Sequence, residues 1–410
     1  LRPDTYVGSI EAQTAKLWVL EEGPVIRQRA VTYCPGLLKI FDEILVNAAD
    51  NKQRDPSMTT IKVEVRSGEI SVWNDGKGIP VQKHAEHGCY VPELIFGHLL
   101  TGSNFDDDEE KTTGGRNGYG AKLANIFSTE FTVETADSSL GLLYRQTWTK
   151  NMTSKTDAAI SKLPSKKGAK DYTKVTFRPD LRRFKMEALD DDAIALLSKR
   201  AYDVASSSSC HSKTALKVYL NGEKIPVKSF ADFVALHEGL SAPVAMEYSP
   251  DGRWVVGIAG NDSGAFQQLS FVNSICTTKG GQHVAVVADA VAQRLAAAAK
   301  KKSKDKDDVK PSFVKTHLSV YVDALIVNPA FDSQTKETLT TRPSKFGTKI
   351  QLSEAFMKKL EKSDIVEQIV AYTKFKQEEQ LKKKRPRAPR PAAARRASAA
   401  SRSSTTPTGP

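Results

Sequence analysis

The pattern of apolar and polar residues predicts a helix at Phe41–Asn51, the best-defined element near the start of the chain. Its apolar residues recur every three or four positions, so one face of the helix is buried. Glu43, Asn47 and Asp50 fall at i, i+4 and i+7 and project from a single stripe. Two carboxylates and an amide on one stripe indicate either a solvated polar face or a reactive one.

The segments after this helix predict mainly strands. Period-two alternation at Thr60–Val65 and Glu69–Trp73 predicts a hairpin with one buried face. Further patterns predict helices at 91–100 and 121–127, strands at 130–135, 142–149 and 172–177, a polar loop at 150–170, and a last hairpin from 216–220 and 225–227. This order predicts an α+β layered sandwich that spans residues 1–228.

The rest of the chain predicts a second α+β unit, residues 229–384. Its expected helices are 230–240, 284–302, 353–362 and 364–384, and its expected strands are 254–259, 268–272 and 317–327. A polar loop at Asn328–Lys336 follows the last strand. Pro, Ala, Ser and Arg dominate residues 385–410, which predicts a disordered basic tail.

Composition narrows the class of protein. The chain has 410 residues, 40% of them hydrophobic, and can bury a large core. No apolar run approaches the roughly 20 residues that a membrane helix needs, so no membrane partner is predicted. The net charge is +12, but residues 382–410 contain nine Lys and Arg and no Asp or Glu, so the folded part is only mildly basic.

The cysteines and histidines predict no metal centre. The four cysteines are far apart and form no CxxC pair. His84 and His87 are three residues apart, but no second pair accompanies them. Neither a zinc site nor a disulfide framework is therefore predicted.

Two glycine-rich segments would let the backbone approach a ligand closely. In Asn74–Gly78 the polar first residue can pair with a base edge while the glycines let the backbone pass, although a plain turn explains the same residues. Gly114–Gly120 supplies unhindered N–H groups before a predicted helix, and Lys122 adds a positive charge. The position of Lys122 disfavours a P-loop, and the absence of His-Arg-Asp and Asp-Phe-Gly disfavours a protein kinase.

These segments resemble the three ATP-binding motifs of the GHKL superfamily, which includes gyrase, MutL, an ATP-dependent heat-shock chaperone and histidine kinases. The resemblance rests on Glu43 and Asn47, Asn74–Gly78 and Gly115–Lys122, in that order. Four more segments are similar to the N-terminal ATPase region of eukaryotic type IIA DNA topoisomerases: Leu1–Ser9, Phe271–Ser274, Thr278–Gly281 and Phe331–Lys336. The resemblance implies a GHKL (Bergerat) ATP-binding α/β sandwich followed by a transducer domain of ribosomal-protein-like α+β fold.

The resemblance also implies roles for individual residues. Glu43 would be the general base for the attacking water, a role worth about 10²–10⁴ in rate. Asn47 would hold Mg²⁺, and Asn74 would contact adenine. Lys336 would reach the γ-phosphate from the second domain, so that the nucleotide state sets the angle between domains. The other expected ATP contacts are Asp50, Asn51, Gly76, Gly78, Ser103, Asn104, Gly115, Arg116, Asn117, Gly118, Tyr119, Gly120, Ala121, Lys122, Gln334 and Thr335.

The family's mode of action implies the partners. Two subunits close as an ATP-operated gate around a DNA duplex, so a nucleotide-dependent homodimer and double-stranded DNA are expected. Lys300, Lys301 and Lys302 match the family's DNA-contacting lysine loop, although such a cluster also occurs as a solvated helix end. The family's DNA-cleaving core would follow Lys384, so this chain is expected to act with that core and not to cleave DNA itself.

The sequence therefore predicts the Mg²⁺-dependent ATPase gate of a type II topoisomerase. The alternative from another class is a nucleotide-dependent DNA clamp or scaffold, MutL-like, with little turnover. Residues 382–387, Lys-Lys-Lys-Arg-Pro-Arg, predict nuclear localisation or are simply basic disorder.

Overall fold

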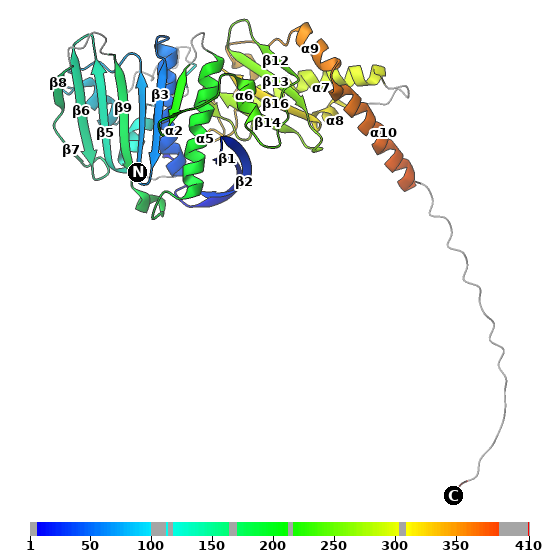
Figure 1. Ribbon diagram of the computed structural model, residues 1–410, viewed down its shortest axis with the longest axis horizontal. Helices are drawn as coiled ribbons and strands as arrows, with labels where there is room; N and C mark the ends of the chain where they lie inside the picture. The colour runs from blue at the N-terminus through cyan, green and yellow to red at the C-terminus, as the bar shows by residue number, and fades with distance from the viewer. Residues whose placement is uncertain are drawn as a thin grey trace.

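Two α+β units lie side by side in the computed structural model of the chain, and helix α10 (Asp364–Lys384) extends away from the second (Figure 1). The structure describes residues 6–99, 112–113, 118–163, 170–211, 216–302, 309–384 and 409, with only the backbone of 376–384. The α+β class predicted from the sequence is confirmed.

The first unit is built on a mixed sheet that has nine strands in the described part of the chain. Its order is β11-β10-β3-β4-β9-β5-β6-β7, with β8 also paired to β6, and the β10–β3 pair is parallel. The bounds are β3 Thr60–Arg66, β4 Glu69–Asp75, β5 Ser128–Asp137, β6 Leu142–Thr149, β7 Ser154–Lys155, β8 Ala159–Lys162, β9 Tyr172–Pro179, β10 Lys217–Leu220 and β11 Glu223–Lys224. The predicted β3–β4 hairpin is confirmed, since Val65 pairs with Ile70 across the turn.

Helix α2 (Pro35–Arg54) packs against this sheet and contains the predicted helix Phe41–Asn51. Its apolar stripe is buried, as the spacing predicts. The helix is longer than predicted at both ends. Pro35 has a φ suited to the first turn, and Lys52 and Arg54 in the last turn complement the helix dipole.

Three further α-helices of the first unit lie in the described residues. Helices α3 (Val91–Gly97) and α4 (Gly120–Ile126) correspond to predicted helices, and α4 packs against α2. Helix α5 (Asp191–Cys210) was not predicted. Its N-cap Asp190 accepts a hydrogen bond from the Ala193 amide at 2.8 Å, which fixes where the helix begins.

Other parts of the first unit also differ from the prediction. An unpredicted hairpin, β1 (Gln13–Glu21) and β2 (Val25–Tyr33), packs on α5 (Figure 1). The predicted loop at 150–170 contains β7 and β8, whose residues are mostly exposed and pair with β6 through the backbone. The strand predicted at 225–227 is wrong: the second strand of this hairpin is β11, which ends at Lys224. Short exposed strands have no apolar alternation by which the sequence could reveal them.

The second unit is a five-stranded sheet with helices, counting only described residues. The order is β12-β13-β16-β14-β15, antiparallel except for the β14–β16 pair. The bounds are α6 Phe230–Ala235, β12 Ala245–Tyr248, β13 Trp254–Gly260, β14 Gln267–Val272, β15 Ile275–Cys276, α7 Gln282–Lys302, α8 Pro311–Lys315, β16 Leu318–Ala324 and α9 Glu354–Glu361. The helix predicted at 230–240 is shorter than expected and ends at Ala235.

The two units share one hydrophobic core at their junction. Phe271 of β14 lies edge-on to Phe230 and Phe233 of α6, with ring centroids 6.2 Å and 5.8 Å apart. All three rings are buried in the same cluster as the α2 stripe. None of the described helices combines the length and apolar character that a membrane crossing requires.

Candidate active site

A cavity of about 930 Å³ opens between α2, the end of β4, α3, the start of α4 and the loop after β16. Side chains from both units therefore line the same space. The predicted site residues that line it are Glu43, Asn47, Asn51, Asn74, Gly78, Gly118, Tyr119, Gly120, Ala121, Lys122, Gln334 and Lys336.

Glu43 is the most strongly constrained side chain of this cavity. Lys39, one turn earlier on α2, forms an ion pair with its carboxylate, and the Lys336 Nζ lies 3.8 Å from Oε1. Burial alone would raise the pKa of Glu43, but the two ammonium groups outweigh burial and lower this pKa to about 2. Burial lowers the pKa of Lys336, while the charge of Glu43 opposes that shift. The carboxylate is thus held ionised by one lysine from each unit.

Three amides extend the polar surface of the cavity. Asn47 and Asn51 follow Glu43 at successive turns of α2. Asn74, on β4, is only 6% exposed, and its side-chain amide donates to the Asp75 carbonyl at 2.9 Å. The neighbouring Asp75 carboxylate accepts hydrogen bonds from the Thr59 and Thr60 amides at 2.8 Å and 2.7 Å. Asp75 therefore fixes the strand end from which Asn74 reaches the cavity.

Glycine is required at two of the cavity positions by close approach. A Cβ on Gly120 would lie 1.8 Å from Oε2 of Glu43, so any side chain there would displace the carboxylate. A Cβ on Gly78 would lie 2.2 Å from the Ala136 carbonyl oxygen on β5. The glycine at 120 thus serves the site, and the glycine at 78 serves the packing of the turn on the sheet.

Lys122 provides a positive charge at the base of the glycine segment. It is 2% exposed, and its Nζ donates to the Gly118 carbonyl at 2.7 Å. Burial lowers the pKa of Lys122 to about 8. A negatively charged group bound in the cavity would therefore stabilise the protonated form of this lysine.

Several predicted contacts lie elsewhere. Asp50 is fully buried and does not line the cavity, although its charge favours the protonated form of Lys336. Gly76 forms the turn with φ 92° and lies against Met58 and Asp55, not against the cavity. Thr335 lines a second cavity, of about 590 Å³, between the units. Ser103, Asn104, Gly115, Arg116 and Asn117 lie outside the described residues.

Some lining residues were not predicted. Ile95 and Phe96 of α3 form one wall, and Thr173 and Val175 of β9 form part of another. These side chains reach the cavity through tertiary packing, for which the sequence contains no local signal. Lys39 could have been found, because it precedes Glu43 by four residues on the same helix.

The lysines Lys300, Lys301 and Lys302 lie at the end of α7, away from the cavity, and all three are exposed. In Figure 1 this helix belongs to the second unit, on the side remote from the nine-stranded sheet. Lys302 pairs with Glu367 of α10 at 3.5 Å.

A buried charge network joins the helix of Glu43 to the second unit. Arg200 of α5 donates to Asp42 at 2.7 Å and to Asp203 at 2.5 Å, and its third nitrogen lies 3.5 Å from the Ser274 carbonyl oxygen. Lys199 pairs with Asp203 at 2.7 Å. Because Asp42 precedes Glu43 directly, the position of the turn that carries Glu43 is tied to α5 and to the second unit.

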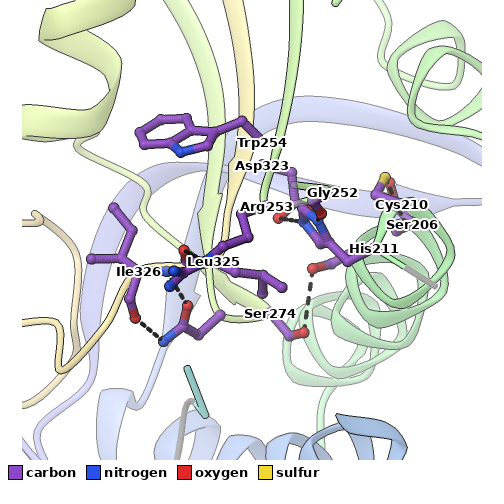
Figure 2. Close-up of polar contacts among 12 residues, drawn as sticks. Ser206, Cys210, His211, Gly252, Arg253, Trp254, Ser274, Asp323, Leu325 and Ile326 are labelled. Carbon is purple, nitrogen blue, oxygen red and sulfur yellow. Dashed lines mark hydrogen bonds and ion pairs between the residues drawn. The ribbon is translucent and has the colours of Figure 1, made fainter. Parts of the chain in front are cut away.

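A second polar link lies at the C-terminal end of α5 (Figure 2). His211 lies 2.9 Å from Asp323 of β16 and 2.9 Å from the Gly252 carbonyl oxygen, and both of its ring nitrogens are engaged. Within the second unit, Asn273 exchanges hydrogen bonds with Ile326 at 2.8 Å and 2.9 Å. The contact of Arg200 with Ser274 and those of His211 with Asp323 and Gly252 thus fix helix α5 to the second unit at two places.

Comparison with known protein families identifies the class to which this fold belongs. The family of histidine kinase-, DNA gyrase B- and HSP90-like ATPases matches residues 34–183, and the DNA gyrase B family matches residues 214–388. The predicted GHKL architecture with a transducer domain is thereby confirmed. Most of the cavity lining lies in the segment that matches the ATPase family, and the loop that carries Lys336 lies in the segment that matches the gyrase B family.

Solved structures and curated relatives narrow the class to one family. The ATPase and transducer domains of DNA topoisomerase II from Balamuthia mandrillaris are 48% identical, with a TM-score of 0.84 over 92% of this chain and 95% of that one. The ATPase region of Saccharomyces cerevisiae topoisomerase II is 44% identical, with a TM-score of 0.81 over the same shares. DNA topoisomerase 2 of Arabidopsis thaliana is 54% identical over 93% of this chain and 26% of its own length. The chain belongs to the DNA topoisomerase II family, matches its ATPase region, and spans about a quarter of that curated relative.

The pair of His211 and Asp323 predicts a pH dependence of stability. Burial would lower the pKa of His211, but the charge of Asp323 and the hydrogen bonds outweigh it, and the pKa is raised above 6.5. The stabilisation is therefore complete below pH 6.5 and is lost as pH rises through the folded-state pKa. Replacing His211 with Gln should lower the free energy of unfolding by about 1–3 kcal/mol near pH 6, and by less at alkaline pH.

Urea unfolding at acidic and alkaline pH measures this difference. His87→Gln, which replaces an exposed histidine, is the control and should show little change at either pH. A loss of stability in His211→Gln that is the same at both pH values would contradict the charged pair.

Proposed function

We propose that this chain binds ATP with Mg²⁺ in the cavity around Glu43 and hydrolyses it, as the gate of a type II DNA topoisomerase. The ion pair between Glu43 of the first unit and Lys336 of the second carries the proposal. It brings a candidate base and a candidate phosphate-binding group from different units into one cavity. A ligand that competes for Lys336 would change a contact between the units.

The residues of the cavity fit an adenine nucleotide. Asn74 offers an amide to a base edge, and Lys122 and Lys336 offer positive charge to phosphates. Gly120 leaves room beside the carboxylate of Glu43. The side-chain oxygen of Asn47 is the hard donor type that Mg²⁺ accepts, and bound Mg²⁺ would neutralise charge on the phosphates.

Glu43 is proposed to accept a proton from the attacking water. With a pKa of about 2 it is a weak base while both lysines face it. A γ-phosphate that draws Lys336 away would remove one of the two charges that depress this pKa, so that Glu43 becomes a stronger base. The binding of ATP would then raise the basicity of Glu43, the residue proposed to accept the proton during ATP hydrolysis.

Replacing Glu43 with Gln should reduce ATP turnover by about 10²–10⁴ while nucleotide still binds. Steady-state hydrolysis and the binding of a fluorescent ATP analogue, measured on the same preparation, separate the two effects. Glu69→Gln on the exposed part of β4 is the matched control. An unchanged rate in Glu43→Gln would remove Glu43 from the reaction, whereas nucleotide binding with negligible turnover in the unmodified chain would favour the nucleotide-dependent clamp.

The gate role requires two copies of the chain. Two subunits that contact each other only while nucleotide is bound would enclose a DNA duplex, and the DNA-cleaving core of the longer relatives would act on it. The chain should therefore be a monomer without nucleotide and a dimer with a non-hydrolysable ATP analogue, as measured by light scattering after size exclusion. Lys336→Met should weaken this dimerisation, and the same mass with and without the analogue would argue against a gate.

Lys300, Lys301 and Lys302 are proposed to bind the phosphates of the enclosed DNA. Removal of one lysine–phosphate interaction should reduce the slope of log affinity against log salt by about one unit, so Lys300→Gln/Lys301→Gln should reduce it by about two. Lys358→Gln/Lys359→Gln, an exposed pair on α9, is the control of equal charge. The slopes of the unmodified chain and of the two double variants are measured by fluorescence anisotropy with a DNA duplex over a range of salt concentrations. If Lys300→Gln/Lys301→Gln has the same slope as the unmodified chain, the DNA binds elsewhere.

A further inference from the structure

Three different metal-donor groups converge around helix α3. The Cys89 sulfur, a Glu93 carboxylate oxygen and a His98 ring nitrogen all lie within 4.8 Å of one another. Cys89 precedes the helix, Glu93 lies in its first turn and His98 is its C-cap. None of the three lines the cavity around Glu43.

We propose that Cys89, Glu93 and His98 form a Zn²⁺ site. Zn²⁺ binds thiolate, imidazole and carboxylate at about 2.0–2.3 Å in tetrahedral geometry, which places neighbouring donors about 3.3–3.7 Å apart. The His98 Nε2 is already 3.8 Å from the Glu93 Oε1. Closing the remaining gaps takes shifts of about 1 Å or less, and solvent supplies the fourth ligand.

The types of donor select the metal. Sulfur and nitrogen donors favour Zn²⁺ over Mg²⁺ or Ca²⁺, which prefer an all-oxygen shell. Binding converts the Cys89 thiol to a thiolate and releases its proton to solvent, so the affinity should fall as the pH falls. The site is therefore chemically distinct from the proposed Mg²⁺ position at Asn47.

The ammonium group of Lys155 already forms an ion pair with Glu93. The Glu93 side chain is 11% exposed and forms an ion pair with Lys155, whose own side chain is 51% exposed. Lys155 can turn into solvent or keep one carboxylate oxygen when a metal ion takes the other. The charges of Glu93 and Cys89 add to burial in raising the pKa of Tyr144, so both donors act on a buried group, where charges interact more strongly than in water.

A second group nearby is less suitable. His84, Glu86 and His87 also bring three donors within 4.8 Å, but they include no thiol, and Glu86 and His87 are exposed. The backbone amide of Glu86 donates to the His84 Nδ1 at 3.3 Å, which occupies one of its nitrogens. His84 contributes instead through its backbone, whose N–H donates to the Cys89 carbonyl at 2.8 Å and orders the turn before α3.

The proposed Zn²⁺ site lies on the helix that forms one wall of the main cavity. Ile95 and Phe96, between Glu93 and His98, form a wall of the main cavity. A metal ion bound to residues before, within and after α3 would hold this wall in one position. Zn²⁺ would thus act on the cavity without entering it.

Cobalt substitution of the reduced full-length chain, without nucleotide, tests the assignment. Co²⁺ bound to a thiolate absorbs in the near ultraviolet by charge transfer. We expect this band in the unmodified protein, its loss on addition of Zn²⁺, and its absence in Cys89→Ser. Cys210→Ser, which removes another free cysteine outside the donor group, should keep the band.

Competition with a chromogenic chelator measures the Zn²⁺ affinity, which should weaken at least about tenfold in Cys89→Ser and in His98→Ala. Even the loss of a group that only hydrogen-bonds to a metal ligand has an effect of this size. In the unmodified chain, Zn²⁺ should slow the alkylation of Cys89. This measurement does not depend on the folding of any variant. A band that persists in Cys89→Ser, an alkylation rate that Zn²⁺ leaves unchanged, or binding lost only in His84→Ala/His87→Ala would overturn the site.

Discussion

The buried carboxylate of Glu43 is the constraint on which the site depends. An ionised carboxylate in this environment is unfavourable unless positive groups accompany it. Lys39 supplies one from the same helix, and Lys336 supplies the other from the second unit. Gly120 completes the arrangement, because a side chain there would overlap the carboxylate. One group thus fixes helix α2, the glycine segment and the loop after β16 relative to one another.

The sequence could predict elements whose burial alternates regularly. The β3–β4 hairpin, strand β6 and helix α7 agree with the prediction to within two residues, because each has one apolar face. Helix α5 was missed although Asp190 gives a capping signal. Its buried charged residues Lys199, Arg200 and Asp203 interrupt the apolar period. They pair with one another along the helix, and Arg200 also pairs with Asp42, which is far away in the sequence.

For the site, motif resemblance could place residues near a ligand but could not predict which face each would present. Glu43, Asn74, Lys122 and Lys336 do line one cavity. Asp50 lies on the predicted polar stripe, only about 20° around the helix from Glu43, yet it is fully buried and does not line the cavity. Thr335 neighbours Lys336 but faces the other cavity, because the chain turns here: the Lys336 amide donates to the Ser333 carbonyl at 3.1 Å, and Lys336 has a φ of 59°. Lys39 had a local signal, whereas Phe96 depends on packing alone.

The junction between the units combines an apolar core with buried charges, and the two have different consequences. The rings of Phe230, Phe233 and Phe271 in the second unit share a buried cluster with the apolar stripe of α2, and such apolar burial is not directional. The bonds of Arg200 to Asp42 and Asp203 are directional and carry a desolvation cost that only good geometry offsets. A turn of α2 that moved Asp42 by even about 1 Å would lengthen such a bond past its useful range. Because Glu43 is the next residue, a change in its lysine partners cannot alter the local position of α2 without also acting on α5 and, through it, on the second sheet.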